Sequence, residues 1–363
     1  MDVMKCTFSA ALFAVSVVVV PAVTVSAEEV AMGNCRNFDE VPVATGTEAD
    51  DEYELIFSDE FDAADGTQPD ADKWVRCPRQ SSTWNRWLSD SEEVIYIEDG
   101  KLVARAIPNP DQDTDPVPMI TGGVQSKGKF DFKYGKIEAR ILTNPHKGNF
   151  PAFWMMPTNQ SGGWPTCGEI DIWEQIDAQN VAYHTIHSNW TYNLGNKNNP
   201  KSSFNENVDM SQYHIYGFEW DETSMRWYVD GKQVGSYAKS NDADALAKGQ
   251  WPFDKEFYII LNQSVGNGSW AADADVSHTY VTLFDWVRVY QKKSTGVNGV
   301  VDNSGMKINA TDGCIHINCD RPTEVTICDI TGRMVYHGST VTSADVEVSG
   351  GIYIVNNQKV LVR

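Results

Sequence analysis

Three carboxylates lie within six residues of one another, in the segment Gly168-Glu169-Ile170-Asp171-Ile172-Trp173-Glu174. The apolar residues between them favour a β-strand, in which successive side chains point to opposite faces. Glu169 and Asp171 would then share a face, and Glu174 would join them only if one extra residue formed a β-bulge. Three like charges on one face destabilise a fold. We therefore interpret this arrangement as one that serves a chemical reaction.

Paired carboxyl groups of this kind hydrolyse glycosidic bonds. One carboxyl protonates the leaving oxygen while the other attacks the anomeric carbon or activates water. A carboxylate between them keeps their pKa values apart. The alternative interpretation is an exposed strand edge with solvated charges. The nearby tryptophans, Trp154, Trp164 and Trp173, favour the first interpretation because sugars stack on aromatic faces.

The segment resembles the signature of glycoside hydrolase family 16, in the bulged Glu-x-Asp-x-x-Glu form of laminarinases. The resemblance extends from about residue 53 to residue 292, with further fragments in matching order. These fragments are Ser58-Asp59-Glu60-Phe61, Tyr134-Gly135-Lys136-Ile137-Glu138-Ala139-Arg140, Pro151-Ala152-Phe153-Trp154-Met155-Met156-Pro157, Tyr228-Val229-Asp230-Gly231, Leu261-Asn262 with Gly266 and Trp270, and Asp285-Trp286-Val287-Arg288-Val289-Tyr290.

The resemblance implies roles for the three carboxylates. Glu169 corresponds to the nucleophile, Asp171 to the assisting carboxylate and Glu174 to the general acid/base, and no cofactor is expected for catalysis. The residues alone identify Glu169 and Glu174 as the outer pair and leave open which of them attacks. A general acid that works near neutral pH needs a raised pKa, which a neighbouring charge and the apolar Trp173 would provide.

Four further residues are candidates for substrate binding. The resemblance places Asn85 in sugar contact, although an ordinary turn asparagine is the alternative. Trp154 and Trp164 are candidate stacking walls, with burial in the core as the competing interpretation, and the turn residues around Trp164 favour an exposed loop. His187 matches a family position near the acid/base, whereas His184 would share its face only if the strand bulges.

The resemblance also implies a structural calcium site away from the catalytic carboxylates. Its ligands would be Glu60, Asp285 and a backbone carbonyl near Gly100, since calcium prefers oxygen ligands. Two ordinary surface acids are the alternative. Such an ion would tie the first strand to the last.

Short β-rich stretches separated by turn residues begin at Tyr53. The dipeptides Asp99-Gly100 and Asp230-Gly231 are typical of tight turns between paired strands. No sustained 3.6-residue periodicity interrupts this pattern. We therefore predict an all-β fold in which residues 53–292 form a two-sheet sandwich, and the resemblance specifies a β-jelly roll with a substrate groove across its concave sheet.

A small β-domain is predicted over residues 306–363, after a linker of small and polar residues at 293–305. The segments Asp329–Arg333, Gly350–Tyr353 and Lys359–Val362 resemble the C-terminal sorting domain of the Bacteroidetes type IX secretion system. This resemblance implies the secretion machinery as a partner. A small accessory β-domain or a carbohydrate-binding module is the alternative.

The first 27 residues have the pattern of a secretory signal peptide. Lys5 precedes the apolar run 8–20, and Val25-Ser26-Ala27 resembles a cleavage site. Residues 28–52 form a polar, acidic lead-in. The apolar run is too short to span a membrane comfortably, so we expect no membrane insertion and a secreted or cell-surface location. The remaining six cysteines permit disulfides in such an oxidising setting.

The formal net charge is −21. Nucleic acids and anionic membranes are poor partners for such a chain, because phosphate binding needs clustered Lys and Arg. The charge also disfavours sulfated polysaccharides, so a neutral glycan fits best.

These observations predict a secreted, retaining endo-β-glycanase that acts on β-1,3-glucan or mixed-linkage β-1,3-1,4-glucan. An endo-β-galactosidase acting on O-glycans or galactans is the alternative on the same fold. A non-catalytic glycan-binding protein is a third hypothesis, which the presence of all three carboxylates disfavours.

Overall fold

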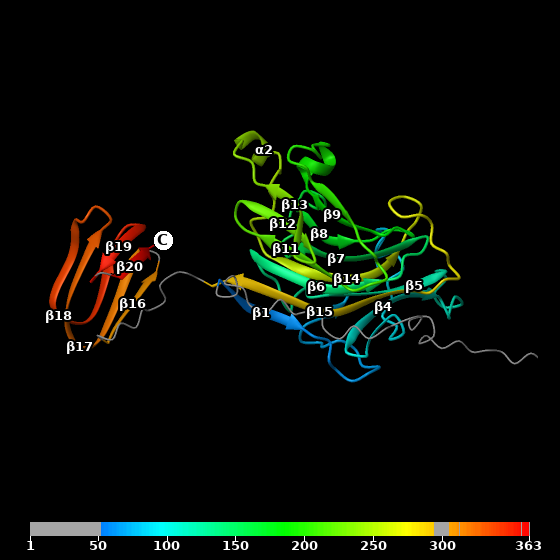
Figure 1. The fold of residues 1–363 in the computed structure, drawn as a ribbon, viewed down its shortest axis with the longest axis horizontal. Coiled ribbons are helices and arrows are strands. Elements are labelled where there is room, and N and C mark those ends of the chain that lie inside the picture. The colour runs from blue at the N-terminus through cyan, green and yellow to red at the C-terminus, as the bar shows by residue number, and fades with distance from the viewer. Residues whose placement is uncertain (1–51, 294–304, 312, 357, 363) are drawn as a thin grey trace, which may run out of the picture. The chain divides into compact units, whose positions relative to one another are not determined.

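The computed structural model describes residues 52–293, 305–311, 313–356 and 358–362 (Figure 1). The predicted signal peptide (1–27), nearly all of the predicted lead-in (28–52) and most of the predicted linker (293–305) lie outside these residues. Among the residues described, no helix is both long enough and apolar enough to cross a bilayer.

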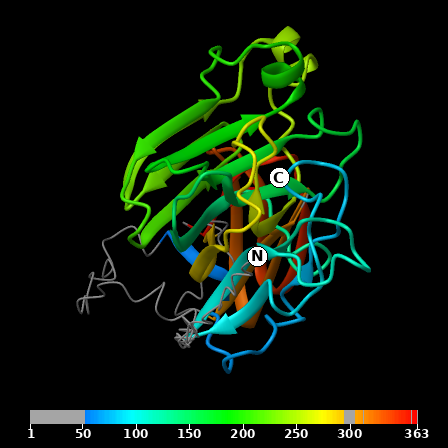
Figure 2. The same cartoon turned by 90° about the vertical axis from the view of Figure 1, so that its right-hand side faces the viewer.

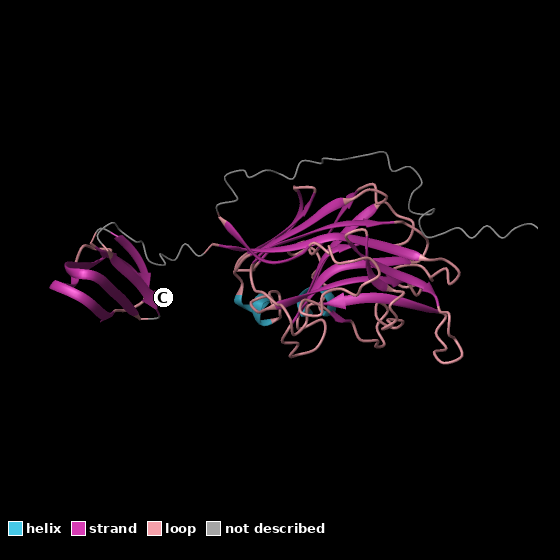
Figure 3. Cartoon of the chain, turned by 90° about the horizontal axis from the view of Figure 1, so that it is seen from below, coloured by secondary structure: helices cyan, strands magenta, loops and turns pink. Residues whose placement is uncertain are grey.

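Residues 53–292 form a single sheet of 15 strands that folds over into two layers (Figure 3). In chain order, strands β1 to β15 are Tyr53–Asp59, Val75–Arg76, Ile95–Glu98, Lys101–Pro108, Met119–Gln125, Gly135–Thr143, Asn149–Pro157, Glu169–Glu174, Val181–His187, Ser203–Asn207, His214–Trp220, Ser224–Val229, Lys232–Ala238, Phe257–Val265 and Tyr280–Lys292. The π-helix η2 (Asn189–Asn193) and the α-helix α2 (Ala243–Ala247) lie beyond the strand ends, at the same end of the sandwich (Figures 1 and 2).

One layer has the strand order β10-β9-β8-β7-β14-β5, and the other has the order β4-β15-β6-β11-β12-β13. The two layers pack their apolar faces together, as in other β-sandwiches. Strand β6 has the alternation that gives a layer one apolar face. Ile137, Ala139 and Ile141 are buried, whereas the polar residues between them are partly exposed. Across the core, the ring of Trp173 in β8 stacks on Tyr216 in β11 at 5.1 Å. The predicted all-β sandwich is confirmed.

The two predicted hairpin turns are also confirmed. Asp99 and Gly100 have φ values of 53° and 66° and connect β3 to β4, where Glu98 pairs with Lys101. Asp230 and Gly231 have φ values of 49° and 77° and connect β12 to β13. Two successive positive φ values give the turn the twist that adjacent antiparallel strands need, and Asp-Gly tolerates them.

The C-terminal region is a separate five-stranded sheet with its own hydrophobic core. Strands β16 to β20 are Met306–Thr311, Cys314–Asp329, Met334–Glu347, Gly351–Val355 and Gln358–Val362. The β-strands predicted after the linker are therefore present in the structure, whereas the domain boundaries and the sorting function stay predictions.

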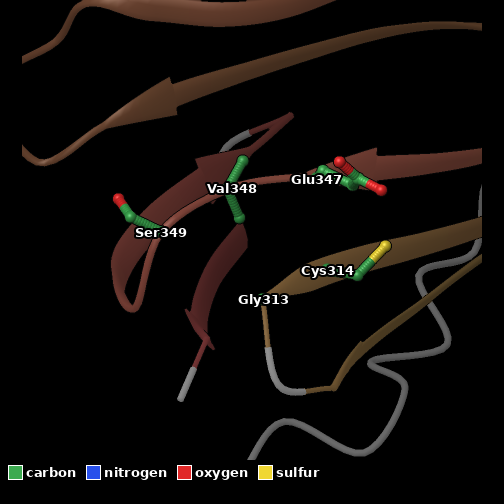
Figure 4. Close-up of a pocket in the computed structure, with 5 residues that line it drawn as sticks. All are labelled: Gly313, Cys314, Glu347, Val348 and Ser349. Carbon is green, nitrogen blue, oxygen red and sulfur yellow. The ribbon is translucent and has the colours of Figure 1, made fainter.

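An open depression of about 500 Å³ lies on this C-terminal domain. Figure 4 shows Cys314 and Glu347 on neighbouring strands beside it. None of the three carboxylates of β8 lines the depression, so it takes no part in their chemistry. The cysteines that the structure describes are free thiols, namely Cys77, Cys167, Cys314, Cys319 and Cys328.

Candidate active site

Strand β8 contains the bulge that its sequence suggested. Asp171 lies opposite Thr185 of β9 and Glu174 lies opposite Tyr183, so three steps along β8 match two steps along β9. The pairing with β7 shifts register over the same stretch. Because the extra residue restores the alternation, Glu174 returns to the face that carries Glu169 and Asp171. The predicted bulge is confirmed.

The opposite face of β8 anchors the strand in the core. Ile170, Ile172 and Trp173 are fully buried between the two layers. Just before the strand, Gly168 has a φ of 91°, and a Cβ at this position would lie 3.0 Å from the ring of Phe253. A glycine is therefore required where the chain enters β8.

The carboxylate face stays accessible from outside the protein. The side chain of Glu169 is 15% exposed and that of Asp171 is 4% exposed, while Glu174 is also partly exposed. Trp164 donates a hydrogen bond from Nε1 to Oε2 of Glu169 at 2.8 Å. His187 lies opposite Glu169, and its Nε2 is 3.7 Å from Glu169 Oε1 and 3.4 Å from Asp171 Oδ2.

Burial raises the pKa values of all three carboxyl groups, and the charge of Asp171 adds to the shift of both glutamates. Burial, followed by the charge of Asp171, raises the pKa of Glu169 to about 8, although His187 and the Trp164 donor oppose the shift. Burial raises the pKa of Asp171 to about 8. The pKa of Glu174 is raised well above its usual value by burial and then by Asp171. The trio therefore holds protons at a pH where isolated carboxyls have lost them.

This arrangement predicts that the carboxylates reduce stability as the pH rises. Their folded-state pKa values lie above the unfolded values, so the folded protein binds more protons between about pH 4 and pH 8, and stability falls across that window. A pKa difference of one corresponds to about 1.4 kcal/mol. We expect Glu169→Gln, which removes one charge, to raise the melting temperature by roughly 3 °C or more at pH 8 and by less at pH 5.

Thermal unfolding of the variant and the wild type at both pH values checks this expectation. Glu138→Gln is the matched control, because Glu138 forms an ion pair with Lys136 on the partly exposed side of β6, and such pairs contribute little. A gain of the same size at pH 5 and pH 8 would show that charge repulsion is not the cause.

The structure separates the two candidate stacking tryptophans. Trp164 is 48% exposed and lies beside Glu169, as the turn residues around it suggested. Trp154 is 5% exposed; its Nε1 donates to Asn262 Oδ1 at 2.7 Å and its ring meets Trp84 edge-on. Trp154 is therefore a packing residue as placed, because its ring offers a sugar almost no free face.

Asn85 is likewise buried, at 3% exposure. Its Oδ1 accepts a hydrogen bond from the backbone N–H of Ser82 at 3.0 Å, which closes a local turn. This placement matches the alternative of a turn asparagine, and the sugar contact stays a prediction.

The two histidines of β9 point to opposite faces. His187 joins the carboxylates, as predicted from its position. His184 is fully buried on the core side, where its Nδ1 lies 2.6 Å from the carbonyl oxygen of Ile172, and burial lowers its pKa to about 4. No bulge in β9 brings His184 to the carboxylates, so only His187 can act on them.

Two exposed aromatic residues complete the surroundings of the trio. Tyr192 of η2 meets Trp164 edge-on at 4.6 Å, near Glu169. Trp270 meets Tyr183 at 5.4 Å, and Tyr183 lies opposite Glu174. Neither residue was predicted individually from the sequence to bind substrate. The aromatic content of the loop that follows β9 was the signal that could have identified Tyr192.

The hydrogen bond from Trp164 gives a second testable expectation. Trp164→Phe keeps an aromatic ring but removes the Nε1 donor, and hydrogen bonds to charged groups contribute about 1.5–3 kcal/mol. We expect kcat/KM to fall by roughly 10–100-fold. Because the donor lowers the pKa of Glu169, its loss should also move the acidic limb of the pH–rate profile to higher pH. An unchanged limb would show that Trp164 acts only as a stacking surface.

The two carboxylates of the predicted calcium site each have an arginine partner. Glu60 accepts hydrogen bonds from Nε and Nη2 of Arg288 at 2.9 and 2.7 Å. Asp285 accepts one from Nη1 of Arg140 at 2.6 Å, while Gly100 occupies the β3–β4 turn. As placed, both carboxylates are engaged by guanidinium groups, and the calcium site stays a prediction.

Three carboxylates on one face of a bulged strand in a β-sandwich fit the chemistry of a glycoside hydrolase. The family model for "Glycosyl hydrolases family 16" matches residues 83–288, which is more than half of the chain. The chain belongs to glycoside hydrolase family 16.

Relatives of this chain act on different glycans. A keratan-sulfate endo-1,4-beta-galactosidase from Sphingobacterium multivorum is 36% identical over 247 residues, which cover 68% of this chain and 57% of that relative. The crystal structure of SCLam, a non-specific endo-beta-1,3(4)-glucanase, is 27% identical, with a TM-score of 0.57 and coverage of 67% of this chain and 92% of SCLam.

A second similar structure comes from work on the endo-acting O-glycanases that prominent members of the human gut microbiota express to initiate mucin breakdown. It is 29% identical and covers 66% of this chain and all of its own, with a TM-score of 0.57. The chain thus spans somewhat more than half the length of the galactosidase, and nearly all of the two structures.

Proposed function

We propose that this chain is a retaining endo-β-glycanase that hydrolyses β-1,3-glucan or mixed-linkage β-1,3-1,4-glucan. The observation that supports the proposal is the bulge in β8, which places Glu169, Asp171 and Glu174 together on one accessible face. Glycoside hydrolysis with retention needs two carboxyl groups in separate roles on either side of the scissile bond.

The surroundings of the two glutamates support the assignment of their roles. Glu169 receives the Trp164 hydrogen bond and lies opposite His187, and both favour its ionised form. Burial and the charges of Asp171 and Glu169 raise the pKa of Glu174 well above its usual value, which favours its protonated form. The ionised carboxylate is the better nucleophile and the protonated one is the better acid.

In the first step, the Glu169 carboxylate attacks the anomeric carbon while Glu174 donates its proton to the leaving oxygen. This step produces a covalent glycosyl-enzyme and releases one end of the glycan chain. In the second step, Glu174 takes a proton from water, and the resulting hydroxide displaces Glu169 with a second inversion. Asp171, between them, raises the pKa values of both glutamates through its charge.

The second candidate function is an endo-β-galactosidase on O-glycans or galactans. It is supported by the 36% identity with the keratan-sulfate endo-1,4-beta-galactosidase and by the similarity to the structure associated with O-glycanases. The strong negative charge of the chain favours an unsulfated glycan in either case.

A substrate panel tests these proposals. The pure protein is incubated with laminarin, mixed-linkage β-glucan, desulfated keratan and mucin O-glycans, and the products are sized. We expect a ladder of oligosaccharides from one glucan, with the β-anomer appearing first by NMR. A ladder from keratan or mucin alone would select the galactosidase. An α-anomer formed first would overturn the retaining mechanism, and no product from any β-glycan would overturn the enzyme proposal.

We also propose a secreted or cell-surface location, with the C-terminal β-domain engaging a secretion system. The signal-like segment at 1–27 and the resemblance of residues 306–363 to a sorting domain support this proposal. Fractionation of cells that express the full chain, or the chain ending at residue 305, tests it. Equal export of both forms would contradict a sorting role for the C-terminal domain.

A further inference from the structure

Three potential metal ligands meet on the carboxylate face of β8. A carboxylate oxygen of Glu169, one of Asp171 and a ring nitrogen of His187 all lie within 4.8 Å of one another. Two come from β8 and the third from β9, so the sheet holds them in fixed register.

A second observation also indicates a ligand here. Oδ2 of Asp171 is buried and has no hydrogen-bond partner among the described residues, and Asp171 as a whole is 3% exposed. His187 Nε2 lies within ion-pair distance of this oxygen, at 3.4 Å, but the two atoms form no hydrogen bond. An unsatisfied buried carboxylate oxygen is costly, and a bound cation would satisfy it.

The chemistry of the donors indicates which cation fits. Two carboxylate oxygens and one imidazole nitrogen suit zinc and similar transition ions, whereas calcium and magnesium prefer all-oxygen sites. The Trp164 hydrogen bond occupies Oε2 of Glu169 and leaves Oε1, 3.7 Å from His187 Nε2, to face the ion. Three protein ligands leave a fourth position open for water.

We propose that Glu169, Asp171 and His187 form a binding site for a divalent transition cation such as Zn²⁺, and that the bound ion inhibits the enzyme. The ion takes the carboxylate electron pair that Glu169 needs to attack the sugar, so ion and glycan exclude each other. The inhibitory part rests on the proposed function, whereas the binding site itself does not.

The inhibition has a defined kinetic form. Zn²⁺ should raise the apparent KM for the glycan and leave kcat unchanged at saturating substrate, and EDTA should restore the original KM. Inhibition that lowers kcat alone would place the ion elsewhere and overturn the proposal.

Direct binding is measured by titrating zinc sulfate into the full, untagged chain in a calorimeter. Glu174→Gln is titrated in parallel, because it keeps all three ligands and removes the proposed acid. We expect one site in both proteins, with affinity at least about 10-fold weaker in His187→Gln and in Asp171→Asn. Thermal unfolding confirms that each variant is folded, and the two independent variants keep the test valid if one of them is not.

His316→Gln is the matched control. His316 also lies beside a carboxylate, with Nδ1 2.7 Å from Asp345 Oδ1 and 4.0 Å from Cys314 Sγ, but it belongs to the C-terminal domain. We expect this variant to bind zinc like the wild type. Binding that is lost in His316→Gln and retained in His187→Gln, or no binding by the wild type, would overturn the site. A chain that binds zinc but cleaves no glycan would contradict only the proposed function.

Discussion

Glu169→Gln is expected to reduce kcat on the polysaccharide by roughly 10⁴-fold or more, because the amide cannot form the covalent glycosyl-enzyme. The substitution preserves the shape of the side chain, and the Trp164 N–H can still donate to the amide oxygen. Initial rates of reducing-end release on the preferred glycan, with protein concentrations raised to detect residual activity, measure the effect.

The control for this variant is Glu138→Gln in β6, which removes a carboxylate from the other layer. Its activity should equal that of the wild type. A Glu169→Gln protein that keeps more than about a tenth of wild-type activity would remove Glu169 from the chemical step, whatever the stability of the variant.

Glu174→Ala is expected to show a loss that depends on the leaving group. On the polysaccharide, kcat/KM should fall by about 10²–10⁴-fold, because the poor leaving oxygen needs the proton that Glu174 supplies. A glycoside with an activated aryl leaving group needs no such proton, so its first step should be nearly normal and glycosyl-enzyme should accumulate. Burst kinetics with the aryl glycoside and mass spectrometry of the trapped intermediate measure this difference.

The comparison of the two glutamates distinguishes their roles. Azide, a nucleophile that needs no general base, should restore turnover of the aryl glycoside by Glu174→Ala and not by Glu169→Gln. If azide rescues only the Glu169 variant, the nucleophile and the acid/base are interchanged. If the loss of activity in both variants is the same for good and poor leaving groups, Glu174 does not act as an acid.

The bulge in β8 is one feature for which local sequence was informative. Glu169 and Asp171 share a face by simple alternation, and only one extra residue was needed to bring Glu174 to them. The Asp-Gly turns were equally predictable, because their backbone conformation is a property of two residues. Such features depend on neighbours within a few positions, and so the residue order is sufficient to predict them.

The role of Trp154 was not predictable in this way. Trp154 is held by Asn262, 108 residues further along the chain, and this contact decides that its ring is covered. Likewise, Glu60 accepts a hydrogen bond from Arg288, which lies 228 residues further along the chain. Whether an aromatic or acidic side chain is free or engaged depends on which strands the topology brings beside it.

The sequence by itself determined the fold class, the hairpins and the identity of the three carboxylates. The tertiary structure decided which aromatic residues stay exposed beside them, which histidine faces them, and how far their pKa values rise. The physical reason is that alternation and turn preference are local, whereas burial and electrostatic repulsion arise only when distant segments exclude water from the same place.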